Sequence, residues 1–268
     1  MPKIQTNGIK LYYKERGTGA ALICIMGITA PGDVWELHIQ EWEKHFRCII
    51  VDNRGVGLSD KPTGPYSTEM MADDYAGLMD ALNIEKALVV GCSMGSTIAQ
   101  QLALRHPQKI LGTILMCTWA RCDNYAKSVF EHIKTIKARL TADEFMNYIQ
   151  LLIFTKLYWD NEEKRQAMIT GNEEALLNIN PQPLHALEAQ ADACINHNAF
   201  DQLKNIKSPC LIIGGKDDIF TPKWMAEETA NEIPNSKLHL FDQAGHAFHW
   251  ECLESFNKIS TEWLKEQL

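Results

Sequence analysis

The sequence Gly91-Cys92-Ser93-Met94-Gly95 stands between a short apolar run, residues 87–90, and a segment with a helical pattern, residues 96–104. The order of strand, G-x-S-x-G and helix is typical of a nucleophile elbow, in which a serine sits on a tight turn at the carboxyl end of a strand. Such a turn strains the serine backbone and requires glycine or another small residue on either side. The pattern therefore predicts that Ser93 is a nucleophile, and that amides at the start of the following helix face any negative charge beside its hydroxyl.

The composition is that of an ordinary globular chain of 268 residues, with 46% hydrophobic and 22% charged residues. A net charge of −8 argues against nucleic acid and against an anionic membrane as partners, because both bind basic surfaces. The first residues lack the apolar stretch of a signal peptide, and no apolar run approaches the ~20 residues that span a bilayer. The eight cysteines form no C-x-x-C pair, so we expect free thiols and a cytoplasmic location.

Short apolar runs alternate with amphipathic segments, a pattern typical of a mostly parallel sheet with helices on both faces. Between the runs lie helical patterns, such as the apolar stripe over residues 71–82. The alternation stops near residue 118 and resumes at Ser208. The runs that we predict to be strands are residues 10–13, 21–25, 48–51, 87–90, 112–117, 210–213 and 237–241.

Residues 119–205 contain no convincing strand and are predicted to form three or four helices. Thr141 and Glu144 have the spacing of a capping box, which predicts the start of a helix at this point. A helical insertion between two strands of a parallel sheet is interpreted as a lid over the strand ends. The insertion is too small to hold a large core of its own, which disfavours a separate domain. We therefore expect a core of residues 1–118 and 206–268, with a lid of residues 119–205.

A serine hydroxyl needs a base to become nucleophilic, and the base needs an orienting acid, in the chain order serine, acid, histidine. His246 is the candidate base among nine histidines, because it leaves the end of a predicted strand through a glycine. The acid is expected directly after another predicted strand, where Asp217 and Asp218 are both candidates that sequence chemistry alone does not separate. Asp123, which follows the preceding strand, is an alternative acid.

The oxyanion that forms during acyl transfer needs hydrogen-bond donors. One is expected to be the backbone N–H of Met94, the residue after the nucleophile. The second is expected from the loop after residues 21–25, where Gly27 lets the backbone approach the substrate. The backbone N–H of Ile28 is the natural donor in that loop, whatever its side chain.

Further motifs give the chain a resemblance to the α/β-hydrolase superfamily over residues 8–267. Residues 52–59, Asp-Asn-Arg-Gly-Val-Gly-Leu-Ser, resemble the D-x-R-G-x-G-x-S segment of this family, and residues 244–246 are similar to its histidine loop. In the acid loop of the family the acid is the last residue of G-x-x-D, shortly before T-P, which implies Asp218 as the acid and Asp217 as a bystander. The resemblance also implies an α/β fold with a mostly parallel eight-stranded sheet, flanking helices and a helical lid inserted after the sixth strand.

The chain departs from the family pattern at three positions. The oxyanion loop usually begins His-Gly, whereas here it is Met26-Gly27, similar to the branch that contains aclacinomycin methylesterase and relatives of 3-oxoadipate enol-lactonase. Cys92 stands where the elbow usually has His, Asn or Tyr, and it is an alternative nucleophile that the geometry of the turn disfavours. Ser96 replaces the usual glycine after the elbow and is small enough to preserve the packing of the helix.

These residues predict a serine hydrolase that cleaves carboxylic esters of small hydrophobic or aryl groups through an acyl-enzyme. Enol-lactone hydrolysis, C–C bond hydrolysis and cofactor-free perhydrolysis are alternatives within the same fold. The absence of a His-Gly-x-Gly-Pro-Gly-type loop disfavours C–C bond hydrolysis. A receptor that retains the triad and binds a ligand with little turnover is an alternative of a different class.

The expected partner is a small-molecule ester, and neither composition nor motifs indicate an oligomeric state. His249 forms a possible metal pair with His246, but no cluster of Cys, Asp or Glu at ligand spacing accompanies it, so we expect no metal and no cofactor. Apolar and aromatic residues after the sixth strand are expected to line the substrate pocket, with some of them forming the core of the lid instead. These residues are Trp119, Phe145, Ile149, Phe154, Tyr158 and Trp159.

Overall fold

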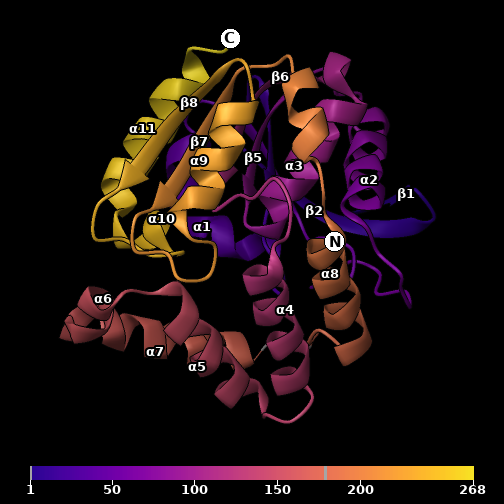
Figure 1. Ribbon diagram of the computed structural model, residues 1–268. Helices are drawn as coiled ribbons and strands as arrows, with labels where there is room; N and C mark the ends of the chain where they lie inside the picture. The colour runs from indigo at the N-terminus through magenta and orange to yellow at the C-terminus, as the bar shows by residue number, and fades with distance from the viewer. Residues whose placement is uncertain (1, 178–179) are drawn as a thin grey trace.

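The centre of the molecule is an eight-stranded sheet with the strand order β1-β2-β4-β3-β5-β6-β7-β8 (Figure 1). The computed structural model describes residues 2–177 and 180–268. Strands β3 to β8 run parallel to one another, whereas β2 is antiparallel to both of its neighbours, β1 and β4. This sheet confirms the predicted α/β fold with eight mostly parallel strands.

One strand of the sheet, β1, is absent from the sequence prediction. Its four residues contain a single apolar side chain, Ile4, and it pairs only with β2 at the edge of the sheet, so no apolar run marks it. The other seven strands overlap the predicted runs. The strands are β1 (Lys3–Thr6), β2 (Ile9–Arg16), β3 (Ala21–Ile25), β4 (Arg47–Val51), β5 (Ala87–Cys92), β6 (Ile110–Met116), β7 (Cys210–Gly215) and β8 (Ser236–Phe241).

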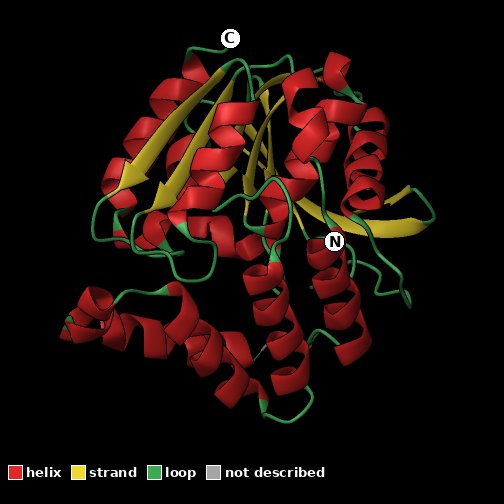
Figure 2. Ribbon diagram, viewed as in Figure 1, coloured by secondary structure: helices red, strands yellow, loops and turns green. Residues whose placement is uncertain are grey.

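Helices cover both faces of the sheet (Figure 2). Ile23 of β3 faces a hydrophobic cluster with α2, α3 and α9, whereas Leu22 and Cys24 face a second cluster with α1, α10 and α11. Because both of their faces are buried, the inner parallel strands β3 to β7 are largely apolar, whereas the edge strand β8 alternates polar and apolar residues. The helices are α1 (Glu36–Trp42), α2 (Thr68–Ala81), α3 (Met94–Arg105), α9 (Lys223–Glu232), α10 (Phe248–Glu251) and α11 (Leu253–Lys265), with short 3-10 turns η1 (Gly32–Trp35), η2 (Pro107–Lys109) and η3 (Phe200–Asn205).

Five further helices come between β6 and β7 in the described residues: α4 (Asn124–Lys137), α5 (Ala142–Ile153), α6 (Lys156–Asp160), α7 (Glu162–Leu176) and α8 (Leu184–Asn196). They gather on the side toward which the arrowheads of β7 and β8 point (Figure 1). The two ends of this insertion lie side by side, since Arg121 and Asn198 form an antiparallel bridge and Ala199 N–H donates to Ala120 O at 2.8 Å. The boundaries of the insertion at residues 119 and 205, and its function as a lid over the strand ends, stay predictions.

The capping box predicted at the start of α5 is confirmed. Thr141 Oγ1 accepts a hydrogen bond from Glu144 N–H at 3.3 Å, and Glu144 Oε2 accepts one from Thr141 N–H at 2.9 Å. The insertion has more helices than the three or four predicted, because Thr155 and Asn161 cap two new starts within one polar-apolar run. A cap side chain accepts from the backbone of the next turn and so begins a helix wherever the chain can bend.

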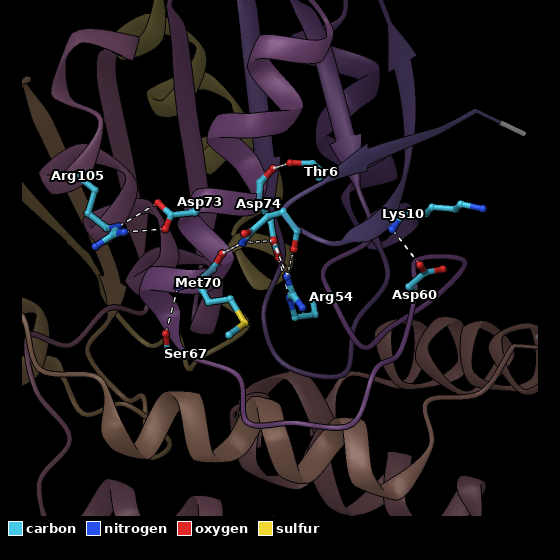
Figure 3. A network of polar contacts seen from close by, with 10 residues as sticks. Thr6, Lys10, Arg54, Asp60, Ser67, Met70, Asp73, Asp74 and Arg105 are labelled. Atoms are coloured by element: carbon cyan, nitrogen blue, oxygen red, sulfur yellow. Dashed lines mark hydrogen bonds and ion pairs between the residues drawn. The ribbon is translucent and has the colours of Figure 1, made fainter.

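A buried ion pair fastens the loop after β4 to α2 (Figure 3). Arg54 Nη2 lies 2.6 Å from Asp74 Oδ1 and Arg54 Nε lies 2.9 Å from Asp74 Oδ2, and the two side chains are 7% and 1% exposed. Asn7 Nδ2 donates to the same carboxylate at 2.8 Å, and Thr6 Oγ1 donates to Asp74 O at 3.1 Å, so β1 is tied to this pair. Burial raises the pKa of Asp74 although Arg54 opposes the rise. Desolvation therefore offsets much of the attraction, and the loss of one partner matters more than the net value of the pair.

Asp74→Asn is expected to lower the free energy of unfolding by about 3–5 kcal/mol, because it leaves the buried guanidinium without its counter-ion. Asp73→Asn is the matched control, since Asp73 precedes Asp74 on α2 and pairs with Arg105 at 2.6 Å near the surface (Figure 3). Such exposed pairs contribute below about 1 kcal/mol. Urea unfolding of both variants and the parent measures the difference, and equal losses in the two variants would contradict the assignment.

Candidate active site

Ser93 lies on the turn between the end of β5 and the start of α3. Its backbone has φ 54° and ψ −120°, a conformation that residues with a side chain rarely adopt. The neighbouring chain approaches this turn so closely that no side chain fits beside it. A Cβ at Gly91 would stand 2.3 Å from Gly95 O, and a Cβ at Gly95 would stand 2.1 Å from Ile25 O in β3. Both glycines of the motif are therefore required by the packing.

The hydroxyl of Ser93 is buried and unpaired. The backbone around it is fixed, because Ser93 N–H donates to Met116 O of β6 at 2.9 Å and Ser96 Oγ donates to Ser93 O at 2.6 Å. The residue is 5% exposed, and among the described residues Oγ has no hydrogen-bond partner, His246 included. Ser93 and His246 nevertheless line the same cavity. A bond between nucleophile and base is often long in a free enzyme and tightens only when substrate binds.

The carboxylate of Asp218 is held by four hydrogen bonds. Its Oδ1 accepts from the N–H groups of Phe220 at 2.7 Å and Thr221 at 2.8 Å. Its Oδ2 accepts from the Thr221 hydroxyl at 2.8 Å and lies 2.9 Å from His246 Nδ1. An ionised carboxylate only accepts, so the hydrogen of the imidazole lies on Nδ1 and the lone pair lies on Nε2. Asp218 thus orients His246 with its basic nitrogen free.

The other two candidate acids lie elsewhere. Asp217 is exposed to solvent, whereas Asp218 is 5% exposed and contacts His246. Asp123 caps α4, where its Oδ1 accepts a hydrogen bond from Ala126 N–H at 2.8 Å. The structure therefore brings one of the three predicted acids to the histidine.

Cys117, which directly follows β6, forms a hydrogen bond with the backbone of His246. Its Sγ donates to His246 O at 2.9 Å, and burial raises the pKa of the thiol well above its ordinary value, so it stays a donor. The side-chain atoms of Cys117, Asp218 and His246 lie within 4.8 Å of one another, a grouping that occurs in metal sites. A metal requires a thiolate and free carboxylate lone pairs, whereas here the thiol is protonated and Asp218 already accepts four hydrogen bonds. The grouping fits a hydrogen-bonded support for the histidine.

The loop after β3 is held in place from both ends. Asn53 Nδ2 donates to Met26 O at 2.7 Å, and Tyr75 OH donates to Asn53 Oδ1 at 2.6 Å, so the amide is fixed in turn. At the other end Thr29 N–H donates to Gln190 Oε1 of α8 at 3.1 Å. The loop is thereby rigid on both sides of the glycine that faces the nucleophile.

The two predicted oxyanion donors both border Ser93. A Cβ on Gly27 would stand 3.2 Å from Ser93 Cβ, so the backbone of the loop lies directly beside the nucleophile, and Ile28 lines the cavity. Met94 is the first residue of α3, where no preceding turn supplies an acceptor for its N–H. Their action as donors stays a prediction.

The cavity around Ser93 has mostly apolar walls, and one of the six predicted pocket residues, Ile149, lines it. Phe145 lines a neighbouring cavity that shares Thr29 and Ile149 with the first. Phe154 and Trp159 line a third depression, on the outer side of α5 and α6. The predicted list of pocket residues therefore needs correction, since five of the six do not line the cavity around Ser93.

Two of the predicted pocket residues belong to packing instead. Trp119 is fully buried and packs against Phe130 at a ring distance of 5.7 Å. Tyr158 stacks on Phe154 at 4.2 Å, in a small cluster under α10. The apolar character of these residues predicts that they are buried but does not tell which neighbour buries them.

The remaining walls of the cavity come from residues that sequence reasoning missed. Leu152 and Ile153 follow Ile149 by three and four residues on α5, so helical spacing was a signal that could have found them. His249 and Trp250 lie in α10, three and four residues after His246; the sequence analysis considered His249 only as a metal partner of His246, and no pattern singles out Trp250. Further lining residues are Val34, Ile133 and Phe220.

Comparisons with known proteins agree with this geometry. A sequence profile described as alpha/beta hydrolase fold matches residues 20–252. The chain belongs to the alpha/beta hydrolase family. This hydrolase-family protein is 29% identical over 258 residues to BpoC of Mycobacterium tuberculosis, named as a non-heme bromoperoxidase, covering 93% of this chain and 95% of BpoC. The predicted resemblance is thereby confirmed.

Two further comparisons indicate the breadth of the family around this protein. It is 28% identical over 265 residues to 2-hydroxy-6-oxo-6-phenylhexa-2,4-dienoate hydrolase of Comamonas testosteroni, covering 96% of this chain and 92% of that enzyme. Its structure is similar to that of a thermophilic esterase from Thermogutta terrifontis, with a TM-score of 0.87, 25% identity and coverage of 100% and 99%. These relatives support hydrolase chemistry without selecting an ester. Among the described residues we find no helix whose length and apolar character would let it cross a bilayer.

Gly95→Ala is expected to lower the free energy of unfolding by about 3 kcal/mol or more, because the new Cβ meets backbone atoms of β3 that cannot move without disturbing the sheet. Gly171→Ala in α7 is the control, since nothing lies within 4 Å of a Cβ there. Alanine in a helix interior is about 0.5–1 kcal/mol more favourable than glycine. Urea unfolding with an unchanged slope measures both shifts, and a Gly95→Ala protein as stable as the parent would be incompatible with this close approach.

Proposed function

We propose that this protein is a serine hydrolase that cleaves carboxylic esters of small hydrophobic or aryl groups through an acyl-enzyme. The observation that carries the proposal is the meeting of two groups in one apolar cavity. These are the unpaired hydroxyl of Ser93 on its strained turn and the ring of His246, which Asp218 orients at 2.9 Å. A nucleophile, a base and an orienting acid are the groups that acyl transfer requires.

In the proposed reaction His246 Nε2 takes the proton of the Ser93 hydroxyl while Oγ attacks the carbonyl carbon of the ester. The carbonyl oxygen becomes an oxyanion, to which the N–H groups of Met94 and Ile28 donate. Each such donor contributes about 3 kcal/mol of transition-state stabilisation. Asp218 accepts from Nδ1 and stabilises the imidazolium that forms.

The second half of the reaction uses the same groups in reverse. His246 gives its proton to the leaving alcohol oxygen as the carbon–oxygen bond breaks, which leaves the acyl group on Ser93. Water then attacks the acyl carbon while His246 accepts its proton, and the proton returns to Ser93 Oγ as the carboxylic acid leaves. No cofactor enters this scheme, since every proton is accounted for by one imidazole.

The walls of the cavity support small hydrophobic or aryl substrates. Ile133 of α4 and Leu152 of α5 come from the insertion, whereas Val34 and Trp250 come from the core. Substrate bound beside Ser93 would therefore contact both parts of the chain, which supports the interpretation of the insertion as a lid. Apolar walls favour an acyl or alcohol group of the same character, because they stabilise it relative to water.

Relatives define the reactions against which esters must be compared. The Thermogutta structure is that of an esterase, and the name of the Comamonas relative describes hydrolysis of a dienoate. The loop Met26-Gly27 lacks the His-Gly start expected of a C–C bond hydrolase, which favours esters. A panel of short-chain, long-chain, aryl and lactone esters, together with a dienoate, ranks these reactions directly.

Ser93→Ala is expected to lower kcat for p-nitrophenyl butyrate by about 10⁴-fold or more, because no other group in the cavity combines a nucleophile with an oriented base. The fold is expected to remain, as circular dichroism would report. A fluorophosphonate label, located by mass spectrometry of peptides, is expected on Ser93 of the parent and nowhere on the variant.

Cys92→Ala is the control for this substitution, since Cys92 is the neighbouring residue and also lines the cavity. The label is expected to remain on Ser93 in that variant. Loss of the label in Cys92→Ala, or unaltered turnover in Ser93→Ala, would contradict the assignment of Ser93 as the nucleophile. If the parent protein binds esters but hydrolyses none of the panel, the result would favour the alternative of a ligand-binding receptor over that of an enzyme.

Asp218→Asn is expected to lower kcat by about 10⁴-fold, because the amide no longer holds the hydrogen of His246 on Nδ1 or stabilises the imidazolium. Asp217→Asn is the matched control, one residue earlier in the same loop and exposed, with an expected change within about twofold. Steady-state hydrolysis of p-nitrophenyl butyrate compares the two. The reverse ranking would move the acid to Asp217.

A further inference from the structure

The cavity contains a further histidine that the proposed reaction does not use. His249 lies in α10, three residues after His246, and its side chain lines the same cavity as Ser93. The residue is 3% exposed. Its Nδ1 is engaged with His38, whereas its Nε2 has no hydrogen-bond partner among the described residues. A polar atom without a partner, on a residue that lines a mostly apolar cavity, is a candidate contact for a ligand.

A chain of hydrogen bonds links His249 through His38 of α1 to Asn257 of α11. His249 Nδ1 lies 2.9 Å from His38 Nε2, and His38 Nδ1 lies 2.6 Å from Asn257 Oδ1. Asn257 Nδ2 donates to Leu37 O at 3.2 Å. A backbone carbonyl only accepts, so the NH₂ group of Asn257 must face Leu37 and its oxygen must face His38.

The orientation of this amide sets every proton in the chain. Because Asn257 Oδ1 only accepts, the hydrogen of His38 lies on Nδ1. A neutral His38 then presents a lone pair on Nε2, to which His249 donates from Nδ1. A neutral His249 carries no second hydrogen, so its Nε2 carries a lone pair that can accept a hydrogen bond.

The surroundings keep both rings neutral. Burial lowers the pKa of His38 to about 4, and burial together with His38 and His246 lowers the pKa of His249 well below its ordinary value. Aromatic rings enclose His38, with Phe256 at 5.0 Å and Trp42 at 5.5 Å, and in the described part of the chain neither histidine forms an ion pair. A positive charge on His249 would also oppose the imidazolium that His246 becomes in the proposed reaction.

We infer from this geometry that His249 Nε2 is a hydrogen-bond acceptor for the substrate, and that the cavity selects esters carrying a hydroxyl or N–H donor beside their apolar group. The inference rests on the proposed function, since it names the class of ester that Ser93 would cleave. A substrate without the donor would displace water from Nε2 and leave the nitrogen unpaired, which weakens its binding relative to a matched donor.

Two series of esters, identical except for one substituent, test the inference. The acyl series is p-nitrophenyl butyrate, 3-hydroxybutyrate and 3-methoxybutyrate, and the alcohol series is benzyl acetate, 3-hydroxybenzyl acetate and 3-methoxybenzyl acetate. In one series or the other we expect kcat/KM of the hydroxyl ester to exceed that of the methoxy ester by about tenfold. Hydroxyl esters no better than methoxy esters in both series would overturn the inference. If the protein hydrolyses none of the six esters, the result would contradict the proposed ester hydrolase activity and not only the role of His249.

Substitution of the ring connects this preference to His249. His249→Phe keeps a planar ring and removes the acceptor, so the ratio of hydroxyl to methoxy ester is expected to fall to about one. His249→Gln places a side-chain oxygen near the position of Nε2 and is expected to restore part of the ratio. A ratio that stays near tenfold in His249→Phe would assign the donor contact to another group and overturn the inference.

The tautomer provides a readout that needs no activity. In protein with ¹⁵N-labelled histidine, His249 is expected to carry hydrogen on Nδ1 and none on Nε2, with its signals assigned by their loss in His249→Gln. A hydrogen on Nε2 of the parent protein would overturn the inference. This measurement can overturn the inference even when His249→Phe fails to fold, and the two ester series on the parent protein then test the contact with substrate.

Discussion

The strained backbone of Ser93 is the constraint around which the rest of the structure is arranged. A residue held at φ 54° and ψ −120° costs on the order of 1–3 kcal/mol and persists only where its surroundings fix it. Here β5 lies between β3 and β6, so Ser93 N–H is tied to Met116 O, and Gly95 packs against the backbone of β3. Two other residues with side chains also have positive φ beside this turn, Thr29 at 70° and Cys117 at 49°. Positive φ values thus occur at three positions around this site.

The segment after β4 contributes to this arrangement without taking part in the chemistry. Asp52 accepts from Gly32 N–H at 2.7 Å and from Leu58 N–H at 2.8 Å, which shapes its own loop. Asn53 holds the carbonyl of Met26, and Arg54 pairs with α2, so three consecutive polar side chains bind three different parts of the core. The D-x-R-G-x-G-x-S resemblance therefore has a physical meaning. It joins the stability of the fold to the position of the loop beside the nucleophile.

The fold and the places of the residues of the proposed site could be predicted because strand ends are readable in the sequence. Apolar runs mark the strands, and Ser93, Asp218 and His246 follow three of them in a required order. The choice between adjacent aspartates needed the family resemblance, since periodicity does not distinguish neighbours. Trp119 could not be placed, because it lies between β6 and α4, outside any helix or strand, where no periodicity indicates its packing partner. The sequence indicated His249 only as a possible metal partner of His246, and its contact with His38 could not be predicted because the two residues are 211 positions apart.

The two histidines of the cavity differ in the group that terminates their hydrogen-bond chains. His246 donates from Nδ1 to a carboxylate, which stabilises the ring when it gains a proton. His249 donates from Nδ1 to a neutral ring, and that chain ends on the amide of Asn257 and a backbone carbonyl, which offer no charge to balance a cation. Both rings therefore carry a lone pair on Nε2, but only the chain of His246 ends on a carboxylate. Asp218 contacts His246 directly, whereas Asn257 is connected to His249 through His38. The group at the end of each chain therefore distinguishes the proposed proton transfer by His246 from the proposed recognition of a donor by His249.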